Sequence, residues 1–297
     1  MAGRWGFPRT RRAREGAAEA VGVADPKAHI LPKLTDAQQR ALDALREEGI
    51  AIVPFQKFFD DALWQDLQAE MGVFVETAEA ELERGVTDKQ KDFLIRRYPR
   101  GESHMPVEPA VLPSDGPWLR FAAGDALLDV VNTYRNVRTK LVDFDLWYTI
   151  PTAGRSDRHA SQQWHRDPED QHVVKVFLYF SDVDEESGPF EYVRYSKSGG
   201  KHGHLWPWGT GKSGYPPSNE LERLTPESDR ILATGPAGTL VICDTSGFHR
   251  GGYARSKPRV LNTQTYVNKK INKPDRRKFQ VDWRKGDLSE QARFALS

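Results

Sequence analysis

The stretch QQWHRDPED, residues 162–170, places a histidine and an aspartate two positions apart, directly after a tryptophan. In an extended segment alternate side chains share one face, so His165 and Asp167 are expected to point together, with Arg166 on the other side. Such a pair is a buried salt bridge, a chance pair on the surface without a role, or two of the three ligands of a metal site. The choice between these depends on the rest of the chain.

A third ligand is available further along the chain. The segment DTSGFHRGGYARSKPRVLNTQTYV (244–267) offers His249 at the end of a strand, and Arg259 opens the next one. Two imidazoles and one carboxylate on one face of an octahedron leave three positions open, which suits non-haem Fe(II) oxygenases. A 2-oxo acid takes two of these positions and dioxygen the third. The far carboxylate of 2-oxoglutarate then needs a fixed cation, and the planar fork of Arg259 supplies a bidentate partner.

Short segments rich in β-branched and aromatic residues surround these motifs and predict strands. They are IAIVPF (50–55), LVDFDLWYTIP (141–151), HVVKVFLYFSDV (172–183), FEYVRY (190–195), GTLVICDT (238–245) and RVLNTQTYV (259–267). Most of them follow one another without an intervening helix. This order predicts an antiparallel sheet that must curl or stack to bury both faces.

The first half of the chain predicts helices. The segment 34–50 predicts a capped helix, with Thr35 as the N-cap and Gly49 as the stop. Ala41, Leu42 and Leu45 form its apolar stripe. A second helix is predicted to begin near Asp60, and a third covers 124–137. We expect these helices to form a layer over residues 35–135 that packs against the sheet.

Composition narrows the function classes. The chain has 297 residues, a net charge of +1 and one cysteine, Cys243. The charge gives no reason to expect nucleic acid as a partner, and the lone cysteine suits a reducing cytoplasm. No apolar run reaches the roughly 18 residues of a membrane span. We expect residues 1–30 to be a disordered basic tail and 31–297 to form a single domain.

The motifs together resemble the phytanoyl-CoA dioxygenase family of Fe(II)/2-oxoglutarate oxygenases. The resemblance rests on QQWHRDPEDQHVVKVFLYFSDVDEESGPFEYV, GTLVICDTSGFHRGG and KPRVLNTQTYV, and it covers about residues 141–267. It implies a double-stranded β-helix, a cupin-like jelly roll, in a mainly β fold with flanking helices. It also implies His165, Asp167 and His249 as iron ligands, Arg259 as the 2-oxoglutarate anchor and Gln162 as a further contact to that co-substrate.

Two departures from the family pattern bear on the site. The family commonly reads PGSH after the second strand, where this chain has Arg194–Lys197, so the turn there lacks its glycine and proline. The interval from His249 to Arg259 is also short, which makes Arg255 a spare candidate for the co-substrate anchor.

Other polar residues have two readings each. His172, His202 and His204 are expected to be solvated rather than metal ligands. Lys175 faces either the barrel interior, where it meets an anionic substrate, or the solvent. The basic run 268–279 is expected to be a solvated face rather than a grip for a phosphorylated carrier.

The connection over residues 198–238 is too long for a plain loop. Its aromatic residues Trp206, Trp208 and Tyr215 either close over a substrate or pack against the helical layer. We expect the connection to act as a partly mobile lid that carries substrate selectivity.

The sequence therefore predicts an Fe(II)- and 2-oxoglutarate-dependent dioxygenase that hydroxylates an unactivated C–H bond of a small molecule, with dioxygen as co-substrate. The presence of Asp167 disfavours halogenation, because halogenating relatives replace that carboxylate by a small residue. A non-catalytic cupin-like binding protein and a zinc hydrolase are the alternatives from other classes. Neither alternative needs a buried 2-oxoglutarate anchor. The placement of Arg259 therefore distinguishes the dioxygenase from both of them.

Overall fold

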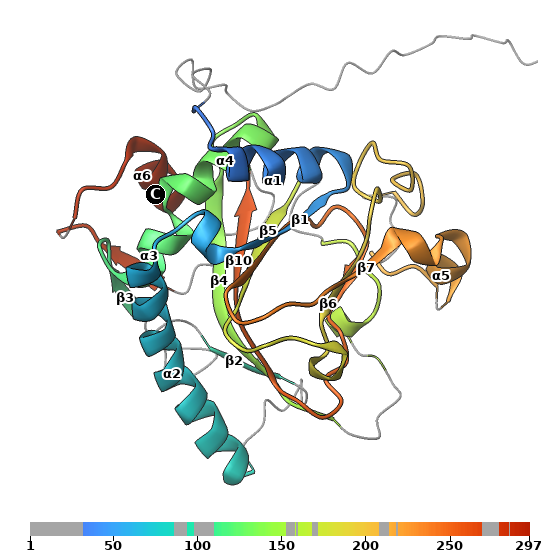
Figure 1. Cartoon of the computed structure of the whole chain (residues 1–297), viewed down its shortest axis with the longest axis horizontal. Coiled ribbons are helices and arrows are strands. Elements are labelled where there is room, and N and C mark those ends of the chain that lie inside the picture. The colour runs from blue at the N-terminus through green and yellow to red at the C-terminus, as the bar shows by residue number, and fades with distance from the viewer. Residues whose placement is uncertain are drawn as a thin grey trace, which may run out of the picture.

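The computed structural model describes most of the chain from residue 32 onward (Figure 1). The described residues are 32–85, 94–97, 110–152, 158, 160–167, 172–207, 214–217, 219–268, 279–284 and 286–297. The predicted tail over residues 1–30 and most of the basic run 268–279 lie outside the described residues.

The largest sheet contains six strands in the order β1-β8-β5-β10-β4-β2. They are β1 (Ile50–Pro54), β8 (Thr239–Asp244), β5 (Val174–Tyr179), β10 (Arg259–Val267), β4 (Lys140–Thr149) and β2 (Leu94–Arg97). Every neighbouring pair is antiparallel. Five of these strands coincide with segments predicted from the sequence, and β2 was not predicted.

A second sheet of three strands faces the first, in the order β7-β6-β9. Its strands are β7 (Arg230–Ala233), β6 (Phe190–Val193) and β9 (His249–Arg250). Apolar side chains from both sheets form one buried cluster between them, and its largest members are Phe177, Tyr179, Phe190 and Tyr192. The predicted stacking of an antiparallel sheet is therefore confirmed.

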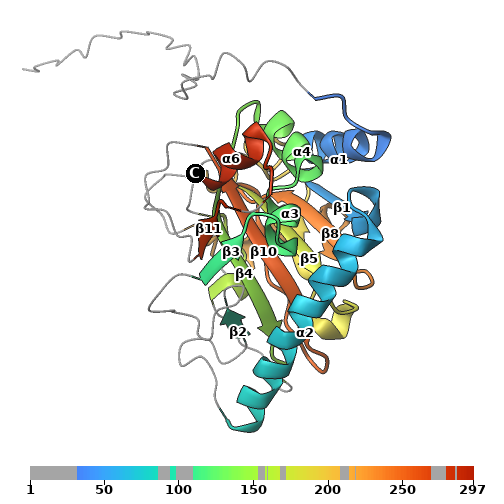
Figure 2. The same ribbon diagram turned by 90° about the vertical axis from the view of Figure 1, so that its left-hand side faces the viewer.

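Helices cover the other face of the six-stranded sheet (Figure 2). They are α1 (Asp36–Glu47), α2 (Asp61–Glu83), α3 (Pro117–Ala122), α4 (Asp125–Arg135) and α6 (Glu290–Leu296). Leu45, Leu67 and Val130 of this layer share a core with Val176 and Ile242 of the sheet. The expected packing of helices on the sheet is confirmed, and it leaves the opposite face of the sheet for the site.

The first helix begins and ends where its sequence signals predict. The Thr35 hydroxyl accepts a hydrogen bond from the Gln38 backbone N–H at 3.3 Å, and the Gln38 side chain accepts one from the Thr35 N–H at 2.7 Å. This capping box satisfies two N–H groups that a helix leaves unpaired. Gly49 has a φ of +89°, which ends the helix and turns the chain directly into β1.

Several short elements carry no sequence signal that would separate them from loops. The parallel pair β3 (Ala110–Pro113) and β11 (Phe279–Asp282) joins distant parts of the chain. The connection 198–238 contains the five-residue helix α5 (Glu220–Leu224) and the unpredicted strand β7. The described part of the chain also contains 3-10 turns at Phe55–Lys57, Ala160–Gln162, Glu185–Ser187 and Glu227–Asp229.

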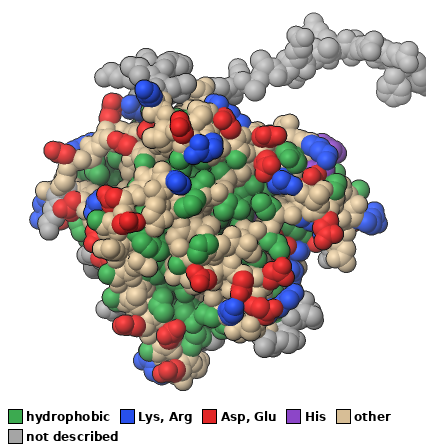
Figure 3. All heavy atoms as spheres, in the orientation of Figure 1, with side chains coloured by type: hydrophobic (Ala, Val, Ile, Leu, Met, Phe, Trp, Pro, Cys, Tyr) green, Lys and Arg blue, Asp and Glu red, His purple; other side chains and the backbone are tan. Residues whose placement is uncertain are grey.

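Within the described residues, no helix combines the length and the apolar character needed to cross a membrane. On the face drawn in Figure 3, acidic and basic side chains are interspersed and neither sign forms a continuous patch. The surface drawn there agrees with the near-neutral net charge of +1.

Candidate metal centre

Two segments that are far apart in the sequence pair side by side, and one of them is β9 of the three-stranded sheet. The backbone N–H of His165 donates to the carbonyl of His249, and the N–H of His249 donates to the carbonyl of His165, both at 3.0 Å. The N–H of Asp167 donates to the carbonyl of Thr245 at 3.0 Å. The first two bonds form an isolated antiparallel bridge, and the third holds Asp167 beside Thr245, so backbone contacts position all three residues.

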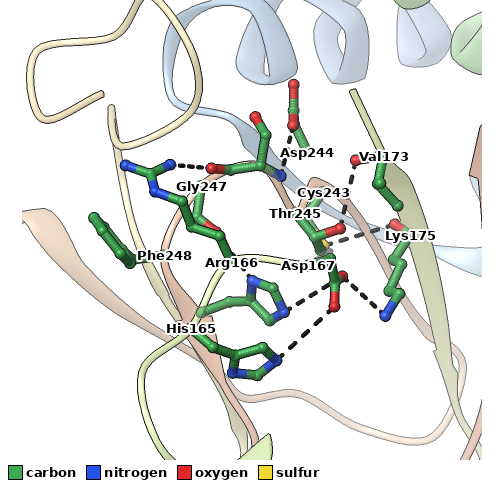
Figure 4. A network of polar contacts seen from close by, with 12 residues as sticks. His165, Arg166, Asp167, Val173, Lys175, Cys243, Asp244, Thr245, Gly247 and Phe248 are labelled. Atoms are coloured by element: carbon green, nitrogen blue, oxygen red, sulfur yellow. Dashed lines mark hydrogen bonds and ion pairs between the residues drawn. The ribbon is translucent and has the colours of Figure 1, made fainter. Parts of the chain in front are cut away.

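The three predicted metal ligands converge on one point. Nε2 of His165 lies 3.9 Å from Oδ1 of Asp167, and Nε2 of His249 lies 3.5 Å from Oδ2. All three ligand atoms lie within 4.8 Å of one another, and all three residues are buried. Figure 4 shows His165 pointing toward Asp167 and Arg166 pointing away toward Phe248. The alternation expected of an extended segment is therefore confirmed.

Each imidazole is held by the same kind of contact, to the backbone carbonyl two residues before it. Nδ1 of His165 lies 2.8 Å from the carbonyl oxygen of Gln163, and Nδ1 of His249 lies 3.0 Å from that of Gly247. A carbonyl only accepts, so each Nδ1 carries the proton and donates it. Each Nε2 then presents its lone pair toward the carboxylate, which is the tautomer that a metal ligand requires.

Electrostatics keep His165 neutral. Burial and the neighbouring His249 lower the pKa of His165 to about 3, although Asp167 acts in the opposite direction. A protonated imidazole cannot bind a cation. The low pKa therefore keeps Nε2 of His165 available as a ligand throughout the physiological range.

Lys175 faces the site rather than the solvent. Its Nζ points toward Asp167 (Figure 4) and lies 2.8 Å from Oδ2 of that residue. Of the Lys175 side chain, 20% is exposed. Burial alone would raise the pKa of the Asp167 carboxyl, but Lys175 and His249 hold it well below its usual value. Asp167 is therefore ionised at neutral pH, and the interior orientation is the correct one of the two predicted for Lys175.

Aromatic rings flank the two histidines. The ring of Phe190 on β6 lies 5.6 Å from that of His249. The ring of Tyr215, from the 198–238 connection, stacks on His165 with centroids 5.4 Å apart and planes 23° apart. Tyr215 is 40% exposed, so its ring touches both His165 and the solvent. Sequence reasoning missed Phe190, whose strand position gave no sign of what it faces.

Arg259 is buried at the start of β10, with 4% of the residue exposed. Its Nη1 donates to the carbonyl of Gly188, and its guanidinium is also hydrogen-bonded to Tyr179. Burial lowers its pKa, with Tyr179 acting in the opposite direction. A Cβ added to Gly251, two residues after His249, would come within 3.9 Å of its Nη2. The guanidinium therefore lies inside the fold, against the chain that follows the distal histidine.

The two remaining candidates for the co-substrate site differ in burial. Gln162 is 3% exposed and follows Ser161, whose carbonyl accepts a hydrogen bond from the Gly251 N–H at 2.7 Å. Arg255, the spare candidate, has 67% of its side chain exposed and lies 3.6 Å from Glu186. Of the two arginines predicted as co-substrate anchors, Arg259 is thus buried and Arg255 is exposed.

One of the three histidines expected to be solvated is not. His202 is 6% exposed, and its Nε2 lies 2.7 Å from Oδ2 of Asp229. The prediction was wrong because the polar composition of the loop gave no indication of that distant carboxylate. His204 is exposed, as expected, and His172 is partly buried. Among the residues that the structure describes, only His165, Asp167 and His249 form a group that could hold a metal.

The turn that lacks the family's PGSH sequence still has a defined conformation. Tyr195 adopts a φ of +63°, the left-handed region that glycine usually occupies. The hydroxyl of Ser196 donates to the carbonyl of Val193 at 2.6 Å and accepts from the N–H of Phe248 at 2.7 Å. The substituted turn therefore supports the residue immediately before His249.

Trp206 does not pack against the helical layer. Its ring meets that of Phe248 edge-on, with centroids 6.0 Å apart, in a small cluster beside the metal centre. This tryptophan is thus part of a core rather than a free lid residue. Trp208 lies outside the described residues.

Comparisons with known proteins agree with this geometry. The family model described as phytanoyl-CoA dioxygenase (PhyH) matches residues 45–260. A search of curated proteins gives no match.

Solved structures show the same fold at low sequence identity. EctD from S. alaskensis, in its apoform, is 20% identical with a TM-score of 0.56, over 89% of this chain and 89% of that one. The epimerase SnoN, solved in complex with Fe3+, alpha ketoglutarate and nogalamycin RO, is 15% identical with a TM-score of 0.52, over 86% and 93%. The non-heme alpha ketoglutarate dependent carbocyclase SnoK is 12% identical with a TM-score of 0.50, over 81% and 88%. The predicted cupin-like jelly roll is confirmed.

Proposed function

The chain belongs to the phytanoyl-CoA dioxygenase family of 2-oxoglutarate-dependent non-haem iron oxygenases, and we propose that it hydroxylates an unactivated C–H bond of a small molecule at the His165–Asp167–His249 centre. The observation that carries this proposal is the convergence of two Nε2 atoms and one carboxylate within 4.8 Å. Two imidazoles and one carboxylate are the donor set of non-haem Fe(II) oxygenases, and they leave positions open for other ligands.

The residues present fit an iron ion and 2-oxoglutarate. His165 and His249 are held in the tautomer that presents Nε2, and Asp167 is ionised, so the donor set is ready for a divalent cation. When bound, iron and 2-oxoglutarate couple oxidative decarboxylation, which yields succinate and CO2, to the transfer of one oxygen atom of O2 into the substrate C–H bond. The protein positions these groups and keeps water away.

Arg259 is proposed to bind the far carboxylate of 2-oxoglutarate. It is buried, always charged and close to the segment after His249, whereas Arg255 is exposed. A bidentate arginine–carboxylate pair in a dry site is both strong and directional. A zinc hydrolase needs no such anchor, so the burial of Arg259 favours the oxygenase over that alternative. Gln162 is proposed as the second contact because it is buried in the same region.

The substrate is proposed to enter on the side of Tyr215. This side chain is half-exposed and stacks on His165, so a molecule approaching the metal centre there meets it directly. The lid-like role predicted for the whole 198–238 connection is thereby narrowed. We propose that the part near Tyr215 selects the substrate and excludes water during turnover.

A direct test is 2-oxoglutarate-dependent release of succinate by the purified chain with added Fe(II). We expect release to require Fe(II) and O2, and to be lost in a His165→Ala variant that retains its fold by circular dichroism. A screen of small molecules for stimulation of this release would then identify the substrate. Succinate release that persists in His165→Ala would contradict the assignment of the centre.

A further inference from the structure

The four residues that flank the two histidines all contact the 198–238 connection. Before and after His165, Trp164 and Arg166 point away from the metal centre, and Phe248 and Arg250 do the same around His249. Arg166 donates to the carbonyl of Leu205 at 3.0 Å, and its guanidinium lies 3.8 Å from the Phe248 ring centroid. The connection thus lies behind the ligands as well as in front of them.

Glu222 on α5 joins one neighbour of each histidine. Its Oε1 accepts a hydrogen bond from the Trp164 Nε1–H at 2.5 Å and another from the Arg250 guanidinium at 3.1 Å. The Arg250 guanidinium also lies over the Trp164 ring, 4.2 Å from its centroid. One carboxylate therefore links the residue before His165 to the residue after His249.

The link through Glu222 is stiff because its side chains are largely buried and because Arg250 and Glu222 each have further contacts. The side chains of Arg250 and Glu222 are 14% and 26% exposed. Arg250 also donates to Glu191 on β6 at 2.6 Å. Leu221, beside Glu222, is fully buried in a cluster with Trp164 and other apolar side chains. Charge-assisted bonds in such surroundings are stronger than those at a solvated surface.

We propose that Glu222 is a positioning residue for the metal centre. It clamps the outer face of the His165–His249 bridge, so that the two Nε2 atoms keep their separation before and after a metal binds. This inference rests on the proposed function and adds a residue to it. Glu222 lies far along the chain from either histidine and would touch neither the metal nor the co-substrate.

The test measures metal affinity separately from stability. Mn(II), which is stable to air, is titrated calorimetrically into the full-length metal-free chain, and thermal unfolding is followed without metal. Removing partners that orient metal ligands typically weakens metal binding by about 10- to 100-fold. We expect Glu222→Ala to weaken Mn(II) binding within that range. We expect Glu222→Gln, which keeps an acceptor oxygen in place, to stay within about threefold of wild type by the same reasoning.

Two further variants make the test decisive. Glu220→Ala, on the same helix but a different face, is the matched control and should bind Mn(II) as wild type does. Trp164→Phe removes the indole N–H donor and one of the two fused rings while keeping an aromatic ring under Arg250, and it should also weaken binding. It replaces Glu222→Ala as the deciding variant if that protein does not fold. Wild-type Mn(II) affinity in the deciding variant, or an equal loss in Glu220→Ala, would overturn the proposal.

A His165→Ala variant separates this inference from the proposed function. If His165→Ala binds Mn(II) as tightly as wild type, the metal does not bind at the triad, and the proposed function fails with the inference. If His165→Ala loses Mn(II) while Glu222→Ala and Trp164→Phe do not, the metal centre stands and only the positioning role fails.

Discussion

His165 and His249 exchange both of their backbone hydrogen bonds at 3.0 Å, so the two imidazoles leave the backbone from directly paired positions. Their ring centroids are 4.2 Å apart, and both rings are turned by the same contact to a carbonyl two residues earlier. The backbone pairing therefore sets the spacing of the two nitrogens, and the clamp proposed for Glu222 would hold that pairing in place. Only Asp167 is positioned independently, through its N–H to Thr245 and through Lys175.

Replacing Asp167 by alanine should abolish turnover while the fold survives. The variant loses the negative ligand and leaves the Lys175 ammonium facing the site, which repels a divalent cation. Mn(II) calorimetry and far-UV circular dichroism would check this. Adding Lys175→Met should restore part of the lost metal affinity. If it restores none, the repulsion from Lys175 is negligible.

Lys175→Met should make metal binding more sensitive to acid. Lys175 is the largest influence that lowers the Asp167 pKa, against the effect of burial. Without it that pKa rises, so the carboxyl becomes protonated at a higher pH and can no longer bind the cation. The measurement is the ratio of the Mn(II) dissociation constants at pH 5.5 and 7.5. We expect a larger ratio in the variant, and an unchanged one would show that Lys175 does not control this carboxyl.

Arg259→Ala should raise the 2-oxoglutarate requirement steeply and leave Mn(II) affinity nearly unchanged. Truncating one partner of a buried charge pair costs about 2 to 5 kcal/mol, more than a tenfold loss of affinity. The matched control is Arg255→Ala, which removes an exposed arginine from the loop just before β10. Steady-state succinate release against 2-oxoglutarate concentration gives the 2-oxoglutarate requirement of each variant. Calorimetry gives its Mn(II) affinity. An effect in Arg255→Ala alone would move the anchor to that residue.

The stability of the metal-free protein should fall as the pH drops from about 6.5 toward 3. His165 has a pKa lowered to about 3 in the fold, against an ordinary value of 6.5, so only the unfolded chain binds its proton between these limits. Within that window, lowering the pH by one unit reduces the free energy of unfolding by about 1.4 kcal/mol through this one group.

Urea unfolding at several pH values, compared with a His165→Gln variant, isolates this contribution. The glutamine side chain does not titrate, so the variant should show a smaller loss of stability per pH unit between pH 6 and 4.5. Parallel curves for the two proteins would mean that His165 titrates alike in the folded and unfolded states.

Tyr215→Ala should uncouple 2-oxoglutarate consumption from substrate oxidation, with little change in Mn(II) affinity. The ring stacks on His165 and is partly exposed, so we expect its loss to admit water to that side of the centre. Tyr215→Phe keeps the stack and should remain coupled. The ratio of succinate to oxidised substrate is the readout. A coupled Tyr215→Ala enzyme would show that this ring neither selects the substrate nor excludes water.

The sequence predicted the parts of the site whose geometry is local. The alternation of His165 and Asp167 and the capping of the first helix at Thr35 follow from spacing alone, and both are confirmed. The five segments assigned to the six-stranded sheet were recognisable because β-branched and aromatic residues recur within each of them. Their order in the sheet follows from long-range pairing, which no local pattern encodes.

Contacts between distant segments could not be predicted. Glu222 meets Trp164 and Arg250 only because the connection folds back behind the site, and His202 meets Asp229 in the same way. The strand β9 has two residues, too few for any periodicity, yet it carries His249. The polar composition of the loop therefore predicted solvated side chains, whereas the structure buries some of them in contacts with oppositely charged partners.

Arg166 and Glu222 secure the connection at two places, on either side of Tyr215. The backbone N–H of Arg166 also donates to the carbonyl of Gly214, and Tyr215 stacks on His165, so this part of the connection is fastened to the ligand segment. Substrate range is therefore expected to diverge by exchange of exposed side chains such as Tyr215 and Pro217, while the backbone keeps its place beside the ligands. A library randomised at these two positions should retain Mn(II) binding in most members and offers a practical route to new substrate scope.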